Sequence, residues 1–256
     1  MSNNITEVVF ILDKSGSMQG FEGDTVGGFN ATLDKQRALD GTVYVSTVLF
    51  NQQSEVLHDR LTIDKIKPMV KEEFSVGGCT ALYDAVGDAV HHIRNVHKYI
   101  RPEDVPDHTV FVIMTDGLEN ASRRYSRADV KRLIGEMGEK GWEFIFLAAN
   151  IDAAEAAEDI GIRRERSASF RQNAWGMKAC YSAASDAICA VRCETSLDDA
   201  DWDRELKEDA EEPVVHCGGI PFDKDAPADT LCGGMQPIRS APPVKMPKRG
   251  LSLKKR

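Results

Sequence analysis

The chain has 256 residues, 42% of them apolar, and a formal charge of −9 at pH 7. This length allows one domain with an extension or two small domains, and the apolar content suffices for a sizeable core. The acidic balance argues against a general nucleic-acid-binding protein, which carries a basic surface. The first stretch, MSNNITEVVFIL, lacks the marks of a secretory signal, and no stretch reaches the roughly 18 apolar residues of a membrane span.

Short apolar runs rich in β-branched residues alternate with segments of helical periodicity. A helix is expected around GGFNATLDKQRAL, although the glycines before it leave its start open. The second and third strands are so close in the sequence that they predict a hairpin. The predicted strands are 7–12, 42–50, 54–63, 108–115, 142–149 and 166–170. The other predicted helices are 80–100, 126–141, 152–161 and 174–192.

This alternation predicts a doubly wound α/β fold with a mostly parallel sheet and helices on both faces. The hairpin adds one antiparallel strand at an edge. The domain is expected to span residues 5–193. After it, Asp and Glu dominate 194–212, Pro and Gly punctuate the next part, and the last residues are basic. We therefore expect 194–256 to be a charged, disordered tail.

Cysteine and histidine residues give weaker signals. The six cysteines form no CxxC pair, which favours reduced thiols and a cytoplasmic location. Cys217 and Cys232, with His216, lack a clear fourth ligand for a zinc site. The histidines of HHIRNVH do not have the spacing of metal ligands on a helix, so they predict a solvated helix face.

The strongest functional signal lies where three predicted strands or loops end at one edge of the sheet. Asp13, Ser15 and Ser17 follow the first strand, in DKSGSM. Thr80 follows two glycines in GGCTAL, and Asp116 follows a central strand in MTDG. Ligands bind in open α/β sheets just beyond the carboxyl ends of the strands, so these side chains should lie together.

Two carboxylates and three hydroxyls form an oxygen-only set, which suits a hard cation, Mg²⁺ or Mn²⁺. Neutral hydroxyl ligands leave such an ion under-neutralised. The ion would then attract one more anionic oxygen from outside the site.

These residues, in this order, resemble the metal-ion-dependent adhesion site of von Willebrand factor type A (integrin I-like) domains, which have a Rossmann-like fold. The family pattern is Asp-x-Ser-x-Ser, then Thr, then Asp, and Asp13, Ser15, Ser17, Thr80 and Asp116 fill it. The resemblance covers about residues 5–193 and is nearest to short bacterial intracellular members. It implies that the three hydroxyls contact the metal, with Thr80 exchanging between direct and water-mediated contact. The aspartates would bind directly or through water.

The resemblance implies a non-enzymatic module in which a protein partner supplies a Glu or Asp to the metal. The alternative is an accessory subunit of an AAA+ ATPase or a kinase-linked machine, as some family members are. A metal-dependent, phosphatase-like hydrolase is a weaker alternative, because Ser15 stands where a haloacid-dehalogenase-type enzyme has its general acid. Asp13, Ser15 or Thr80 could each also cap a helix, but the joint pattern favours metal binding.

Overall fold

The computed structural model describes residues 4–211. The apolar runs form strands and the periodic segments form helices, with boundaries close to those expected. The strands are β1 (Ile5–Asp13), β2 (Thr42–Phe50), β3 (Ser54–Thr62), β4 (His108–Thr115), β5 (Glu143–Ala148) and β6 (Ser167–Ser169). The helices are α1 (Glu22–Arg37), α2 (Leu82–Tyr99), α3 (Arg127–Gly138), α4 (Ala153–Asp159), α5 (Ala174–Arg192) and α6 (Arg204–Glu211).

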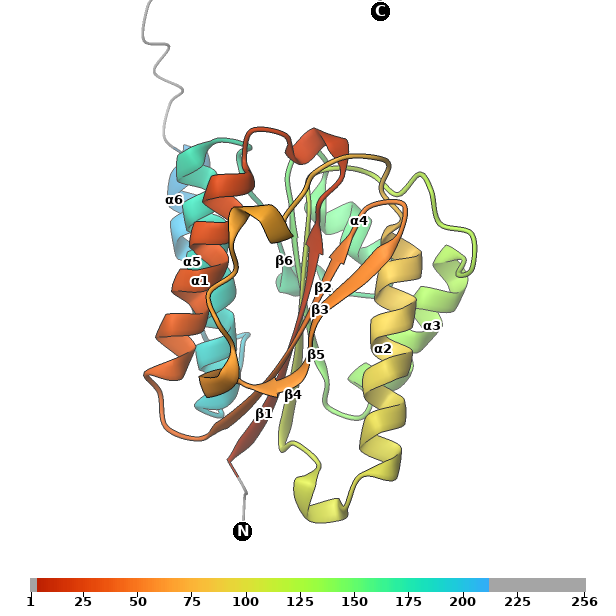
Figure 1. Ribbon diagram of the computed structural model, residues 1–256, viewed down its shortest axis with the longest axis vertical. Coiled ribbons are helices and arrows are strands. Elements are labelled where there is room, and N and C mark those ends of the chain that lie inside the picture. Colours follow the sequence, from red (N-terminus) through yellow and green to blue (C-terminus); the bar gives the residue numbers. More distant parts are fainter. Residues whose placement is uncertain (1–3, 212–256) are drawn as a thin grey trace, which may run out of the picture. The chain divides into compact units, whose positions relative to one another are not determined.

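The strands form one sheet in the order β3-β2-β1-β4-β5-β6. All neighbouring pairs are parallel except β2 and β3, which form the predicted antiparallel hairpin at one edge. The fold class expected from the sequence is thereby confirmed. β1 pairs with β2 on one side and with β4 on the other (Figure 1). The chain therefore builds β2 and β3 on one side of β1 and then β4, β5 and β6 on the other.

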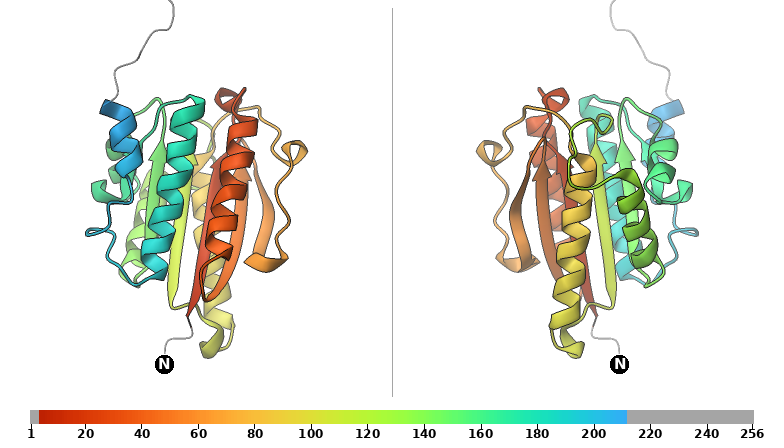
Figure 2. Two further views of the ribbon diagram at one scale, coloured as in Figure 1. Left: turned by 90° about the vertical axis from the view of Figure 1, so that its left-hand side faces the viewer. Right: turned by 90° about the vertical axis from the view of Figure 1, so that its right-hand side faces the viewer.

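Helices cover both faces of the sheet, as Figure 2 shows in its two views. Val8, Phe10 and Leu12 of β1 face the layer that contains α1, α5 and α6, whereas Val9 and Ile11 face the layer that contains α2, α3 and α4. Each of these five side chains is at most 1% exposed. Burial on both faces explains why the strand reads as an unbroken apolar run rather than as an alternating one.

The chain beyond Cys193 differs from the expected disordered tail. α6 packs on α5, and Leu197, Trp202 and Leu206 are at most 4% exposed within the core layer of α1 and α5. One compact unit continues past the expected boundary at residue 193. The rest of the expected tail, 212–256, lies outside the described residues, as do Cys217 and Cys232.

The acidic residues of this segment explain why its composition misled the prediction. Asp198 accepts a hydrogen bond from Arg166 at 2.5 Å, and Asp209, which is 4% exposed, lies 3.8 Å from Arg171. Their charges are therefore neutralised by the domain instead of keeping the segment in solvent. A few apolar residues are enough to dock a helix when its charges have such partners.

A buried acidic side chain lies near the amino ends of the strands. Glu7, on β1, is fully buried, and Arg60 Nε donates to its Oε2 at 2.6 Å. His97 Nε2 lies 3.4 Å from the same oxygen, and its ring packs edge-on against Trp142. The His97 side chain is only 11% exposed, so the expected solvated helix face is wrong at this position. The charge of Glu7 is balanced inside the protein.

No helix in the described part of the chain combines the length and apolar character that crossing a membrane requires.

Candidate functional site

The first predicted site residue, Asp13, is the last residue of β1. The register of β1 and β4 pairs Leu12 with Met114 and so sets Asp13 beside Thr115. Thr115 Oγ1 donates to Asp13 Oδ2 at 2.7 Å, and the backbone N–H of Ser15 donates to Oδ1 at 2.7 Å. Both carboxylate oxygens are therefore held in fixed positions at the centre of the sheet edge.

Backbone hydrogen bonds join the loop after β1 to the loop before α2. The Gly16 N–H donates to the Gly78 carbonyl at 3.0 Å, and the Gly77 N–H donates to the Lys14 carbonyl at 2.9 Å. Gly78 has a φ of +81°, and a Cβ there would overlap a neighbouring side chain, so this turn requires glycine. The two glycines thus bring Thr80 to the edge that carries Asp13.

The hydroxyl groups converge on the second aspartate. Ser15 Oγ and Ser17 Oγ are 3.1 Å apart, and Ser17 Oγ donates to Asp116 Oδ1 at 2.7 Å. Thr80 makes no direct hydrogen bond to these groups through its hydroxyl. However, a Cβ added at Gly117 would lie 3.9 Å from both Ser17 Oγ and Thr80 Oγ1. The glycine therefore leaves a small open space between the two hydroxyls.

A second set of contacts fixes Thr80 and the loop after Asp116. The Thr80 N–H donates to Asn120 Oδ1 at 2.9 Å, and the Asn120 N–H donates back to the Thr80 carbonyl at 3.0 Å. Further along, the carboxylate of Asp84 accepts the backbone N–H groups of 123–125 at 2.9 to 3.0 Å. The loop 117–125 is thereby attached to the start of α2.

The site concentrates negative charge without a basic partner. Asp13, Ser15, Thr80 and Asp116 are each at most 3% exposed, whereas Ser17 is exposed. Within residues 4–211 neither aspartate forms an ion pair, in contrast to Glu7. Burial raises the pKa of Asp13, hydrogen bonds from Thr115 and Ser15 oppose this rise, and the charge of Asp116 adds to it.

This arrangement fits a hard divalent cation. It offers two carboxylates and three hydroxyls around an open space, with no nitrogen or sulfur ligand among these five side chains. A cation would supply the positive charge that the surrounding protein does not. The part of the chain between residues 4 and 211 holds no cluster of three or more His, Cys, Asp and Glu side chains, so an alternative nitrogen- or sulfur-rich centre is not found there.

Two amide side chains that the sequence analysis did not single out complete the site. Gln172 Nε2 donates to Asp116 Oδ2 at 2.6 Å and to the Ser17 carbonyl at 2.9 Å. Asn150 Nδ2 donates to Gln172 Oε1 at 2.6 Å. Asn150 follows β5 and Gln172 follows β6, so the strand-end argument that found Asp13 and Asp116 could also have found both.

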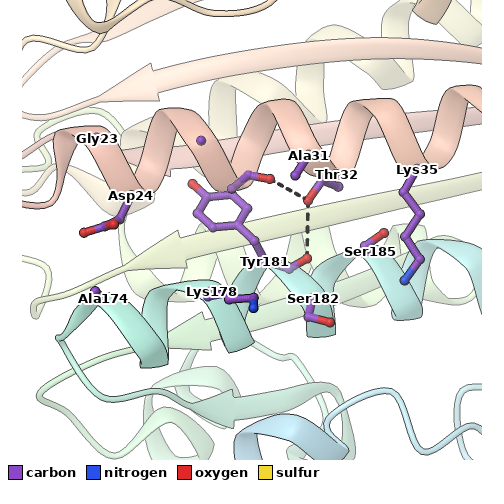
Figure 3. A pocket seen from close by; sticks show the side chains of 12 residues that line it. Gly23, Asp24, Ala31, Thr32, Lys35, Ala174, Lys178, Tyr181, Ser182 and Ser185 are labelled. Carbon is purple, nitrogen blue, oxygen red and sulfur yellow. Dashed lines mark hydrogen bonds between the residues drawn. The ribbon is translucent and has the colours of Figure 1, made fainter.

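A separate hollow lies between α1 and α5, with a volume of about 450 Å³ (Figure 3). Its wall on α1 is made mainly of small residues, including Gly23 and Gly27, together with Asp24 and Lys35, and its wall on α5 includes Tyr181. The Thr32 hydroxyl lies 3.0 Å from the Gly28 carbonyl and 3.3 Å from the Tyr181 carbonyl. Dashed lines from Thr32 mark these contacts in Figure 3. None of the five predicted site residues lines this hollow.

No protein-family model and no curated protein matches the sequence. Solved structures do match the fold. The von Willebrand factor domain of the type V pili tip protein Mfa5 from Porphyromonas gingivalis has a TM-score of 0.53 at 11% identity, covering 72% of this chain and 95% of that one. Proximal thread matrix protein 1 from the mussel byssus has a TM-score of 0.50 at 15% identity, covering 72% of this chain and 46% of that one.

A von Willebrand factor type A protein from Catenulispora acidiphila also matches, with a TM-score of 0.50 and 15% identity, covering 72% of this chain and 42% of that one. The chain thus spans less than half of the mussel and Catenulispora structures. At these identities the similarity establishes the fold. The protein has a von Willebrand factor type A fold, and the resemblance expected from the sequence is confirmed at that level.

Proposed function

We propose that the protein is a non-enzymatic protein-binding module that depends on a divalent metal ion. Asp13, Ser15, Ser17, Thr80 and Asp116 hold Mg²⁺ or Mn²⁺ at the carboxyl edge of the sheet. The metal ion attracts the carboxylate of an acidic residue that belongs to a partner protein. The accessory-subunit alternative uses the same site and differs only in which protein supplies the carboxylate.

One observation carries this proposal. The structure buries two aspartates close to three hydroxyls and gives neither of them a basic partner within the described chain. Burying a charge without a partner is costly, and Glu7 shows the usual remedy in this same protein, with Arg60 at 2.6 Å. A bound cation would do for Asp13 and Asp116 what Arg60 does for Glu7.

The residue types of the site also favour a binding role over catalysis. Ser15, at the position of a general acid in haloacid-dehalogenase-type enzymes, has no carboxylate to offer. Within the described chain the cysteines are free thiols, which supports the proposed cytoplasmic location.

Titration calorimetry of the full-length protein with MgCl₂ and MnCl₂ tests the metal site. Asp13→Asn and Asp116→Asn each remove one charge and keep the size of the side chain. Substituting a residue that only orients metal ligands typically weakens metal binding about 10–100-fold. We expect each of these two substitutions to weaken metal binding by more than that. Asp64→Asn is the matched control, because Asp64 is an exposed aspartate in the turn after β3.

Equal metal affinity in wild type, Asp13→Asn and Asp116→Asn, with circular dichroism showing all three folded, would contradict the assignment of the site. Gly117→Ala adds a test that removes no ligand. Its methyl group enters the space between Ser17 and Thr80, so we expect weaker metal binding with an unchanged melting temperature.

A further inference from the structure

The edge that carries the site also exposes two large apolar side chains. Leu118 is 64% exposed and Trp175 is 59% exposed, although side chains of this size are usually buried. We call Leu118 and Trp175 the apolar flanks. Tryptophan is enriched among the residues that dominate the binding energy of protein interfaces, so an exposed tryptophan beside a binding site is a candidate anchor for a partner.

The chain itself limits how far the apolar flanks lie from the site. Leu118 is two residues after Asp116, so their Cα atoms are at most about 7 Å apart. Trp175 is three residues after Gln172, so the Cα atoms of these two residues are at most about 11 Å apart. The Gln172 amide donates to Asp116. Both flanks therefore belong to the edge of the sheet that carries Asp116.

The apolar flanks stand on opposite sides of the site. Leu118 belongs to the loop that Asn120 attaches to Thr80, before α2. Trp175 lies in the first turn of α5, where its ring is approached by Lys178 at 5.4 Å. α2 and α5 cover opposite faces of the sheet (Figure 2). An incoming segment would therefore pass between the two flanks.

Charge complementarity decides what such a segment would carry. Because hydroxyls are neutral ligands, the metal ion keeps an attraction for a further carboxylate, and this attraction would act on any acidic residue. Selectivity therefore has to come from contacts beside the metal, and Leu118 and Trp175 offer apolar ones.

We propose that the partner presents an Asp or Glu with bulky apolar residues beside it, and that these residues pack against Leu118 on one side of the site and Trp175 on the other. This proposal rests on the metal-dependent function proposed above. It adds the identity of the recognised motif, an acidic residue with an aliphatic or aromatic neighbour.

Two peptide libraries test the motif on the full-length protein. Each is a random heptapeptide mixture with a fixed central residue, Asp in one and Asn in the other, selected in MgCl₂ and in EDTA. We expect capture only from the Asp library and only with Mg²⁺, with Leu, Ile, Met or Phe enriched beside the Asp.

Individual peptides from the enriched pool then measure the flanks. Leu118→Ser and Trp175→Ser should each weaken binding about tenfold, which corresponds to about 1.4 kcal/mol, while calorimetric Mg²⁺ affinity stays at the wild-type value. Tyr99→Ser is the matched control, because Tyr99 is 77% exposed at the far end of α2. It should leave peptide affinity unchanged.

The outcomes separate the two proposals. Mg²⁺-dependent capture of the Asp library with no preference beside the Asp overturns the motif and leaves the proposed function intact. Capture that persists in EDTA, or that is equal for Asp and Asn, overturns the proposed function. A Tyr99→Ser loss equal to the flank variants, or no capture of any library, counts against the motif.

Discussion

Trp202 offers a direct test of whether the segment after Cys193 belongs to the domain. Its side chain is 4% exposed and packs in the core layer of α1 and α5. Replacing a buried tryptophan by alanine typically costs about 3–5 kcal/mol, because apolar contacts are lost and a cavity remains. For a domain of this size each kcal/mol lowers the melting temperature by about 2–4 °C, so Trp202→Ala should lower it by roughly 6–20 °C.

The assay is thermal unfolding of full-length protein followed by circular dichroism, with hydrogen exchange of the α6 amides as a second readout. α6 has eight residues, too few to be stable alone, so its order depends on docking through Trp202 and Leu206. We expect its amides to lose protection in Trp202→Ala. The matched control is Trp175→Ala, which removes a tryptophan that is 59% exposed and should cost less than about 1 kcal/mol.

A melting temperature within about 2 °C of wild type, together with unchanged exchange in α6, would refute the burial of Trp202. The original interpretation of 194–211 as a solvated tail would then hold.

Three further predictions concern the packing and the charges. Gly28→Ala should destabilise the protein by about 1–3 kcal/mol in urea melts, because its Cβ would overlap a tyrosine ring on α5. Gly27 has open space around it, so Gly27→Ala should stabilise α1 by up to about 1 kcal/mol. Burial alone would raise the pKa of Asp84, but three backbone N–H donors hold it below its ordinary value. The stability that Asp84 contributes is present above about pH 4, the ordinary pKa, and is lost as pH falls from there through the lower pKa of the folded state. The deficit of Asp84→Asn at pH 7 should therefore shrink at pH 3. Arg60→Met leaves Glu7 buried without its main partner and should cost about 3–5 kcal/mol at pH 7, a cost that Glu7→Gln in the same chain should partly relieve.

Much of the architecture can be predicted from the sequence because its central strands are buried on both faces. Such strands produce unbroken apolar runs, as in β1, and their carboxyl ends locate the candidate site. The hydrogen bonds that join Ser17 to Asp116, and Thr115 to Asp13, then follow from a register that the pattern alone does not specify.

The parts that could not be predicted share one cause, namely that a polar residue does not reveal its partner. The acids around Trp202 look solvated until Arg166 and Arg171 are placed beside them. In the sequence His97 belongs to a helix face that is expected to be solvated, but in the structure its Nε2 lies 3.4 Å from the buried Glu7 carboxylate. Gln172 is an ordinary loop residue in the sequence, and only the position of β6 brings its amide to Asp116.

The origin of each site residue in the sheet has a consequence for how the site opens. Asp13 and Thr115 lie at the ends of the two central strands, whose amides are expected to exchange with solvent only when the whole domain unfolds. Gln172 follows β6, a three-residue edge strand in which no residue is fully buried, and such elements open locally at a much lower free energy. Asp13 should therefore keep its position for as long as the domain stays folded. The Gln172 amide should open and close many times within that period. Entry of a ligand to the site is then controlled by the edge of the sheet, and retention of the ligand is controlled by the central strands.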